Sequence, residues 1–219
     1  MTTLRGVVPM RITMKTLAAL TAVVLLIPTE SVLAQRRRGL ADVTPPERHG
    51  FWLSAGVGAG WESYKFAVPG NWAPSQMAPS VWFALGGTVN PQLRLGGELN
   101  AWVFENFDEE SGFNVVESLV GGLLTAQVYP ARRLGLFLKG GLGLSRSGAD
   151  IEGPGGSTGE TGFAALGGAG YEIRVGRNFF ISPTANLLYH WSGDRDAPDG
   201  NLRERVFTLG VAFTFQPGR

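Results

Sequence analysis

The sequence predicts an all-β protein, namely an eight-stranded antiparallel up-and-down transmembrane β-barrel preceded by a cleavable signal peptide. Over most of the chain, large apolar residues alternate with small or polar ones, which is typical of β-strands. Glycine supplies 32 of 219 residues and charged residues only 17%, which is too little charge to cover the outside of a soluble barrel. A short apolar run near the N-terminus also indicates an exported chain.

Residues 1–34 have the organisation of a secretory signal peptide. Lys15 gives a basic start, an apolar stretch runs from Leu17 to Ile27, and small residues lead to Ala34. The stretch is shorter than the roughly 20 apolar residues that a membrane-spanning helix needs. We expect translation to begin at Met14 and cleavage to follow Ala34.

Residues 35–50 form a separate segment, which we interpret as a mobile periplasmic arm. It holds three consecutive arginines from Arg36 and the pair Pro45-Pro46, and it has no apolar period. The arginines suit either a solvated tail or contact with anionic lipid. The barrel itself is expected over 51–216.

Eight segments with a period of two follow the arm, and we assign one strand to each. In the last segment one face is apolar throughout: Phe207, Leu209, Val211, Phe213 and Phe215. The strands are expected at 51–62, 78–89, 92–104, 113–129, 134–146, 161–175, 178–192 and 202–215. Tight turns alternate with longer polar loops at 63–77, 105–112, 147–160 and 193–201. Strands of this length cross a hydrocarbon layer when tilted, so the alternation predicts an up-and-down membrane barrel.

The composition of the two strand faces predicts which of them points into the lumen. The non-aliphatic face is rich in glycine, serine and threonine, which suit the interior of a narrow barrel. A basic side chain in the middle of the lipid-facing surface would cost about 2–4 kcal/mol. The strand charges all fall on the non-aliphatic face: Arg94, Glu98, Glu117, Lys139, Glu172 and Arg174. We therefore place the aliphatic face in lipid, which excludes a soluble calyx. In the lumen we expect a polar network of Arg94, Glu98, Lys139, Glu172 and Arg174.

Within that network, Glu98 and Lys139 are expected to lie near mid-height, with Glu172 as a further candidate, and to form a structural ion pair. A proton path or an ion gate is the functional alternative. Phe137 and Phe180 fall on the same face and predict a filled lumen instead of an aqueous pore. Aromatic residues near the strand ends predict two interfacial girdles: Phe51, Tyr129, Phe179 and Phe215 at the turn side, and Trp61, Tyr64, Tyr189 and Trp191 at the loop side.

The last strand carries the pattern Thr208-x-Gly210-x-x-Phe213-x-Phe215, followed by four further residues. With this pattern and its eight segments, the chain resembles the small eight-stranded outer-membrane β-barrel family, which includes the OmpA membrane domain and OmpW-like and OmpX-like proteins. The resemblance implies location in the outer membrane of a Gram-negative-type bacterium, beside outer-membrane lipid and lipopolysaccharide, with the long loops facing outside. It also implies that Thr208, Gly210, Phe213 and Phe215 form the signal read by the barrel-assembly machinery. We expect a monomer.

One constellation at the loop side of the seventh segment suggests chemistry. His190 and Ser192 lie two residues apart, and Glu204 follows on the next strand. A serine activated by a histidine that an acid orients is the arrangement of acyl transfer. The pattern resembles that of the lipid A deacylases, which implies Ser192 as nucleophile, His190 as base and Glu204 as the orienting acid. However, Gly193 stands where that family usually has asparagine, and strand parity points the three side chains into the lumen, away from a lipid substrate.

Composition excludes several other kinds of site. The chain has no cysteine, which excludes disulfides, zinc–cysteine sites and iron–sulfur clusters. Its two histidines, His49 and His190, are too far apart in sequence for an obvious transition-metal site, so no metal and no cofactor is expected. The acidic loop stretches 108–110 and 194–199 fit solvated charges better than a calcium loop. A formal net charge of +1 gives no indication of a nucleic-acid partner.

These observations favour a non-catalytic integral outer-membrane β-barrel protein. Its role would be membrane integrity, surface interaction or a narrow porin-like passage. Two alternatives stay open at this point. One is a lipid A acyl hydrolase that uses Ser192, His190 and Glu204, and the other is an OmpW-like conduit for small hydrophobic molecules.

Overall fold

A computed structural model describes residues 48–65, 71–108, 113–131, 134–151, 156–193 and 202–217. The predicted signal peptide, the arm as far as residue 47 and most of the acidic loop residues lie outside the described residues. The domain boundaries at 34 and 50 therefore stay predictions.

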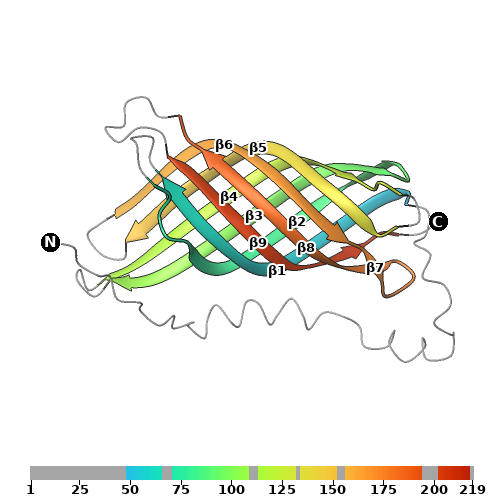
Figure 1. Cartoon of the computed structure of the whole chain (residues 1–219), viewed down its shortest axis with the longest axis horizontal. Helices are drawn as coiled ribbons and strands as arrows, with labels where there is room; N and C mark the ends of the chain where they lie inside the picture. The colour runs from blue at the N-terminus through green and yellow to red at the C-terminus, as the bar shows by residue number, and fades with distance from the viewer. Residues whose placement is uncertain are drawn as a thin grey trace. The chain divides into compact units, whose positions relative to one another are not determined.

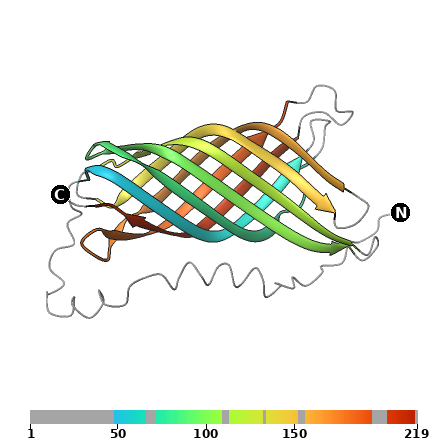
Figure 2. The same ribbon diagram turned by 180° about the vertical axis from the view of Figure 1, so that it is seen from behind.

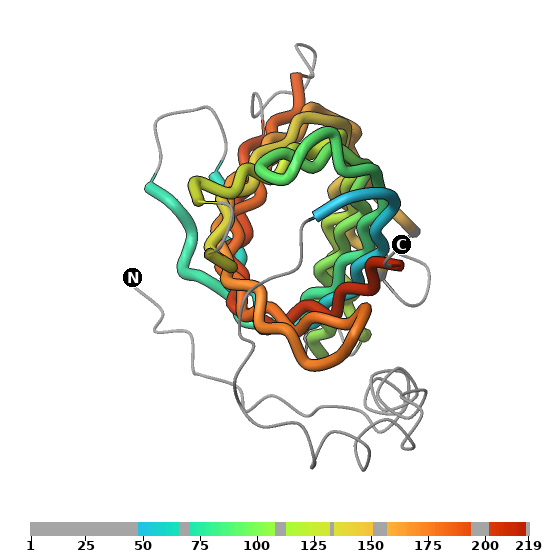
Figure 3. Tube along the Cα trace, turned by 90° about the vertical axis from the view of Figure 1, so that its right-hand side faces the viewer, coloured from blue at the N-terminus to red at the C-terminus, as the bar shows by residue number. Residues whose placement is uncertain are grey.

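The described residues form one closed antiparallel β-sheet. Its strands are β1 (Gly50–Lys65), β2 (Gln76–Asn90), β3 (Leu93–Asp108), β4 (Phe113–Val128), β5 (Leu136–Ile151), β6 (Gly156–Tyr171), β7 (Ile173–Arg174), β8 (Phe179–Trp191) and β9 (Arg203–Phe215). Neighbours in sequence pair from β1 to β6 and from β7 to β9, β9 pairs with β1, and β6 pairs with β8, so the sheet closes on itself. Figures 1 and 2 show the tilted strands from opposite sides, and Figure 3 shows the ring that they form.

The prediction of an eight-stranded up-and-down barrel is confirmed, although one predicted strand is interrupted. The segment expected at 161–175 consists of β6 and the two-residue β7, which are separated at Glu172. There the Glu172 N–H donates to the Gly135 carbonyl over 2.8 Å. An added Cβ at Gly135 would lie only 2.2 Å from the Glu172 carbonyl oxygen, so the approach requires glycine.

Two ends of the barrel can be distinguished by their connections. The turn end holds the connections 91–92, 129–135 and 175–178, together with the start of β1 and the end of β9. The loop end holds the connections 66–75, 109–112, 152–155 and 192–202. Strands extend further toward the loop end than expected: β1 reaches Lys65 and β3 reaches Asp108. Backbone pairing continues there after the apolar alternation has stopped, because ladder hydrogen bonds do not depend on apolar side chains.

The assignment of the two strand faces is also confirmed. On β4 the adjacent residues Leu123 and Leu124 are 4% and 79% exposed, and this alternation is repeated around the barrel. Leu99 and Leu142 are among the outward apolar side chains, whereas Arg94 and Lys139 are buried in the lumen. The surface that faces away from the lumen is therefore the apolar one.

Aromatic rings fill much of the lumen. Phe137 and Phe180 are buried there as expected, and three tryptophans join them: Trp52, Trp82 and Trp102. Glycine on the lumen face makes room for these rings, since an added Cβ at Gly56 would lie 2.1 Å from the Trp82 ring. Among the described residues, no helix is long and apolar enough to cross a membrane.

Candidate functional site

A buried ionic network closes the lumen at the turn end. The Arg94 guanidinium donates to the Tyr129 hydroxyl over 2.6 Å, to a Glu172 carboxylate oxygen, and to Gln216 Oε1 over 2.5 Å. Tyr129 in turn donates to Glu172 over 2.8 Å. Arg94 is 1% exposed and Tyr129 is not exposed at all. This group, together with Arg48, is called the Arg94 network below.

Arg48 enters the same network from the segment that precedes β1. Its Nε donates to the second oxygen of Glu172 over 3.2 Å, and its Nη2 donates to the Leu134 carbonyl over 3.0 Å. The guanidinium carbon lies 3.5 Å from the centre of the Tyr129 ring, a cation–π contact. Gly50, with a φ of +74°, follows in the left-handed region that favours glycine and turns the chain into β1. The last residues of the predicted arm thus reach into the barrel end.

One aromatic side chain, Tyr129, and one ionic side chain, Arg174, lie in places that the sequence analysis did not assign. Tyr129, expected in the interfacial girdle, instead points into the lumen because it continues the inward parity of Gln127 on β4. Just past the end of β4, burial raises the pKa of the Tyr129 hydroxyl, and the adjacent Glu172 charge raises it further. The hydroxyl therefore stays protonated and donates to Glu172 across the physiological pH range.

Arg174 lies outside the network that the sequence predicts for it. The residue is exposed in β7, and its side chain donates to the carbonyls of Gly176 and Arg177 in the following turn. Solvent is available at this end of the barrel, so the charge needs no buried partner. Glu117 is half-buried and lies nearer the loop end, on the same face of β4 as Leu119.

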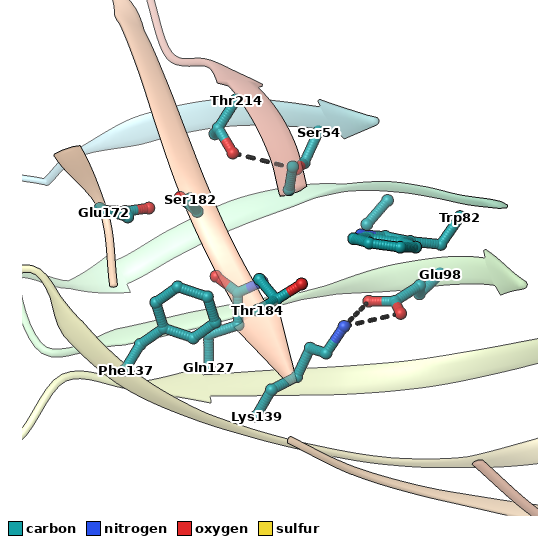
Figure 4. Close-up of a pocket in the computed structure, with 12 residues that line it drawn as sticks. Ser54, Trp82, Glu98, Gln127, Phe137, Lys139, Glu172, Ser182, Thr184 and Thr214 are labelled. Atoms are coloured by element: carbon teal, nitrogen blue, oxygen red, sulfur yellow. Dashed lines mark hydrogen bonds and ion pairs between the residues drawn. The ribbon is translucent and has the colours of Figure 1, made fainter. Parts of the chain in front are cut away.

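A second ion pair lies deeper in the lumen. Lys139 Nζ donates to both oxygens of Glu98, over 2.8 and 2.9 Å (Figure 4). Asn100 donates to the same carboxylate over 3.2 Å. Both charged groups are almost fully buried. The structure thus brings Glu98 and Lys139 together, whereas Glu172 belongs to the Arg94 network.

Little open space lies beside this pair. A cavity of about 10 Å³ is lined by Trp82, Phe137 and the Lys139–Glu98 pair, and Figure 4 shows these side chains pointing toward one another. A second cavity of about 10 Å³ lies toward the loop end, between Trp82 and Trp102. Each is about the size of one water molecule.

The three candidate catalytic side chains lie close to one another but form hydrogen bonds with other partners. His190, Ser192 and Glu204 are together called the rim below. His190 and Glu204 are directly opposite on β8 and β9. His190 Nδ1 lies 2.6 Å from Ser145 Oγ, Ser192 donates to Glu160 over 2.5 Å, and Glu204 accepts from Ser147 over 2.6 Å. All three side chains are buried on the lumen side. The structure therefore brings the residues together without the serine–histidine–acid hydrogen bonds of a catalytic triad.

The residues of the terminal pattern occupy distinct positions on β9. Phe213 faces outward, and Phe215 packs against Phe179 at 5.1 Å between ring centroids. Thr208 is buried and its hydroxyl bonds to Ser80 over 3.3 Å. An added Cβ at Gly210 would lie 2.4 Å from the Val57 carbonyl oxygen, so this glycine allows β9 and β1 to close the barrel.

The described residues include no group of three or more histidine, aspartate or glutamate side chains that could hold a metal ion. Arg48, Arg94 and Glu172 form one ionic group in the lumen, and Lys139 and Glu98 form another. Their geometry is suited to neutralising buried charge.

Sequence reasoning missed several residues of the Arg94 network. Arg48 stands outside any periodic segment, so no pattern places it in the lumen. Gln216 lies one residue past the last strand. Parity would have found Tyr129, since it lies two residues after Gln127 on the same face.

The fold has several solved relatives. Ail, the attachment invasion locus protein of Yersinia pestis, solved in complex with the heparin analogue sucrose octasulfate, is 14% identical, with a TM-score of 0.50 over 76% of this chain and 99% of Ail. The Neisserial surface protein A is 15% identical, with a TM-score of 0.51 over 77% of this chain and 97% of that protein. OprG of Pseudomonas aeruginosa is 11% identical, with a TM-score of 0.44 over 78% of this chain and 98% of OprG.

At these identities the likeness concerns the fold alone. No curated protein matches the sequence. The model of the family described as the outer membrane protein beta-barrel domain matches residues 31–215, which is most of the chain. The protein therefore belongs to the outer-membrane β-barrel family and is located in the outer membrane.

Proposed function

We propose that the protein is a non-catalytic outer-membrane barrel whose lumen does not conduct, and that it serves membrane integrity and surface contact. In this proposal the loop end faces outside the cell. The N-terminal arm of an exported chain would then lie in the periplasm, since β1 begins at the turn end.

The buried ion pairs and aromatic rings inside the lumen are the observation that carries the proposal. At the turn end, Arg48 and Arg94 converge on Glu172, and Tyr129 completes the closure. Further along, Trp82 and the Lys139–Glu98 pair leave a cavity of only about 10 Å³. An ion or a hydrophobic solute would have to displace buried ion pairs to pass, and breaking such a pair costs about 3–5 kcal/mol.

The rim supports the non-catalytic part of the proposal. A serine nucleophile needs its histidine as proton acceptor. Here Ser192 donates to Glu160 instead, and His190 bonds to Ser145. The three side chains also face the lumen, whereas an acyl chain of a membrane lipid lies against the outward surface.

Single-channel recording in planar bilayers tests the closed lumen. We expect the purified wild type to insert without conductance steps under conditions in which a general porin conducts. The double variant Trp82→Ala, Trp102→Ala, which removes two rings from the lumen, serves as the comparison. Wild-type steps that increase in this variant would show that current passes through the lumen and would overturn the proposal.

A further inference from the structure

Three basic side chains share the outward face of the barrel at the loop end of β1 and β9. Lys65 pairs with Arg203, and Arg205 is the next outward residue of β9. Paired residues of an antiparallel sheet project to the same side. Arg203 and Arg205 are exposed, whereas Glu204 between them is buried.

Trp72 organises two of these cations. The guanidinium carbon of Arg205 lies 4.1 Å from the centre of the Trp72 ring, and Lys65 Nζ lies 4.8 Å from it. Tyr189 meets the edge of the same ring at 6.5 Å between centroids. A backbone hydrogen bond from Ala73 to the Tyr64 carbonyl, 2.9 Å long, ties this segment to β1. The cations are therefore held in place before any ligand arrives, which lowers the entropic cost of binding.

On β1 and β9, strand parity separates positive from negative charge at this end. Glu62 and Glu204 are buried toward the lumen, and Glu160 is bonded to the inward Ser192. The ion pairs that join Arg48, Arg94 and Lys139 to glutamates lie in the lumen, and none of them involves Lys65, Arg203 or Arg205. Among the described residues of β1 and β9, the outward face carries these basic side chains and no acidic one.

The height of these cations relative to the membrane indicates their ligand. Outward aromatic rings lie beside and below them: Trp191, opposite Arg203 on β8, packs against Phe163 at 6.1 Å, and Phe207 packs against Trp61 at 6.2 Å. Such rings mark the membrane interface. Arg205 lies two residues beyond Phe207 on the same face, which is the level of lipid headgroups.

We propose that Lys65, Arg203, Arg205 and Trp72 form a binding site for the phosphate groups of a glycolipid in the outer leaflet, called the phosphate site below. Guanidinium groups bind phosphate through paired hydrogen bonds, and the indole face holds the arginine plane. The inference rests on the proposed orientation, with the loop end outside, and it adds a specific lipid contact to the proposed membrane role.

The test compares two double variants that each remove two positive charges. Arg203→Gln, Arg205→Gln alters the phosphate site, whereas Arg174→Gln, Arg177→Gln alters exposed arginines at the turn end. Each protein is placed in phosphatidylcholine nanodiscs that contain either bisphosphorylated lipid A or fully dephosphorylated lipid A. Lipid retention is then measured by native mass spectrometry. Unboiled gel mobility verifies that both variants fold.

We expect the phosphate-site variant to lose about thirtyfold in affinity for bisphosphorylated lipid A, because each basic residue at a membrane surface contributes about fivefold. The turn-end variant should stay near wild type, and dephosphorylated lipid A should bind weakly to all three proteins. Equal losses in the two variants, or equal binding of dephosphorylated lipid A by the wild type, would overturn the proposal.

Orientation is tested separately, because nanodiscs expose both sides of the membrane. The chain has no native cysteine, so Gly193→Cys at the loop end and Arg177→Cys at the turn end each give one thiol. An impermeant maleimide should label Gly193→Cys in intact cells and Arg177→Cys only after the outer membrane is permeabilised. The reverse pattern would refute the orientation and remove the site from the outer leaflet, whatever the lipid assay shows.

Discussion

Two groups of buried side chains in the lumen bring opposite charges to hydrogen-bond distance. Lys139 donates to both oxygens of Glu98, and Arg94 and Arg48 share the two oxygens of Glu172. An ion pair of this kind contributes little relative to apolar packing, but removing one partner leaves an uncompensated charge. Each member of a pair therefore matters mainly because its removal would leave the other as an uncompensated buried charge.

This asymmetry gives a prediction for the Lys139–Glu98 pair. Lys139→Met should lower the free energy of unfolding by about 3–5 kcal/mol, because among the described residues Glu98 then keeps only Asn100 as a hydrogen-bond partner. The measurement is urea unfolding of the barrel refolded into vesicles. Lys139→Met combined with Glu98→Leu should recover most of the loss. A single variant as stable as the wild type would contradict the account of the pair.

A second residue-scale prediction concerns the rim. Cells that express Ser192→Ala should yield the same lipid A mass spectrum as cells that express the wild type, because Ser192 donates to Glu160 and not to His190. Comparable insertion of both proteins is the control. Loss of one acyl chain with the wild type alone would identify the rim as a catalytic site.

Glycine positions determine how closely the strands approach. An added Cβ at Gly58 would meet the Leu209 carbonyl oxygen at 2.3 Å, and the reciprocal contact at Gly210 is similarly short. These contacts involve backbone atoms, which cannot move aside as a side chain can. The β1–β9 seam that closes the barrel therefore depends on the absence of side chains at both positions.

Alanine substitution at the seam tests this dependence. Gly210→Ala should destabilise the barrel by about 1–3 kcal/mol, since overpacking forces the backbone to shift. Gly167→Ala on β6 is the matched control, because nothing lies within 4 Å of its added Cβ. Vesicle-refolded proteins are compared by urea unfolding. If both variants were equally stable, the seam would not limit closure.

The strand elements were predictable from the sequence because a period of two follows directly from the geometry of a strand. The paired glycine contacts were not, since they depend on register between strands. Tyr129 differs, because its parity with Gln127 places it on the lumen face, although an aromatic residue near a strand end also suits an interfacial girdle. The break between β6 and β7 follows from the close approach of Gly135 to Glu172, which local sequence does not encode.

At the scale of the whole molecule, the barrel between its two ends places its apolar residues outward and its charges inward. This inversion of a soluble protein could be predicted because lipid penalises charge on the outward face. The closure of the turn end could not, since Arg48 and Gln216 lie outside the periodic strands. The hydrogen-bond partners of Ser192 and His190 could not be predicted either, because they lie on β6 and β5, which are distant in sequence.

The central claim is a membrane-embedded barrel with a filled lumen, and a cysteine scan along β4 tests it most directly. Single cysteines at positions 119–124 carry a nitroxide label, and the label's collisions with oxygen and with a water-soluble nickel complex are measured in bilayers. Outward positions such as Val120 and Leu124, 47% and 79% exposed, should be accessible to oxygen, which dissolves in lipid. Inward positions such as Leu119 and Leu123 should be protected from both reagents. Nickel access at the inward positions would reveal an aqueous pore, and nickel access at the outward positions would place this face in water, so either result would contradict the account.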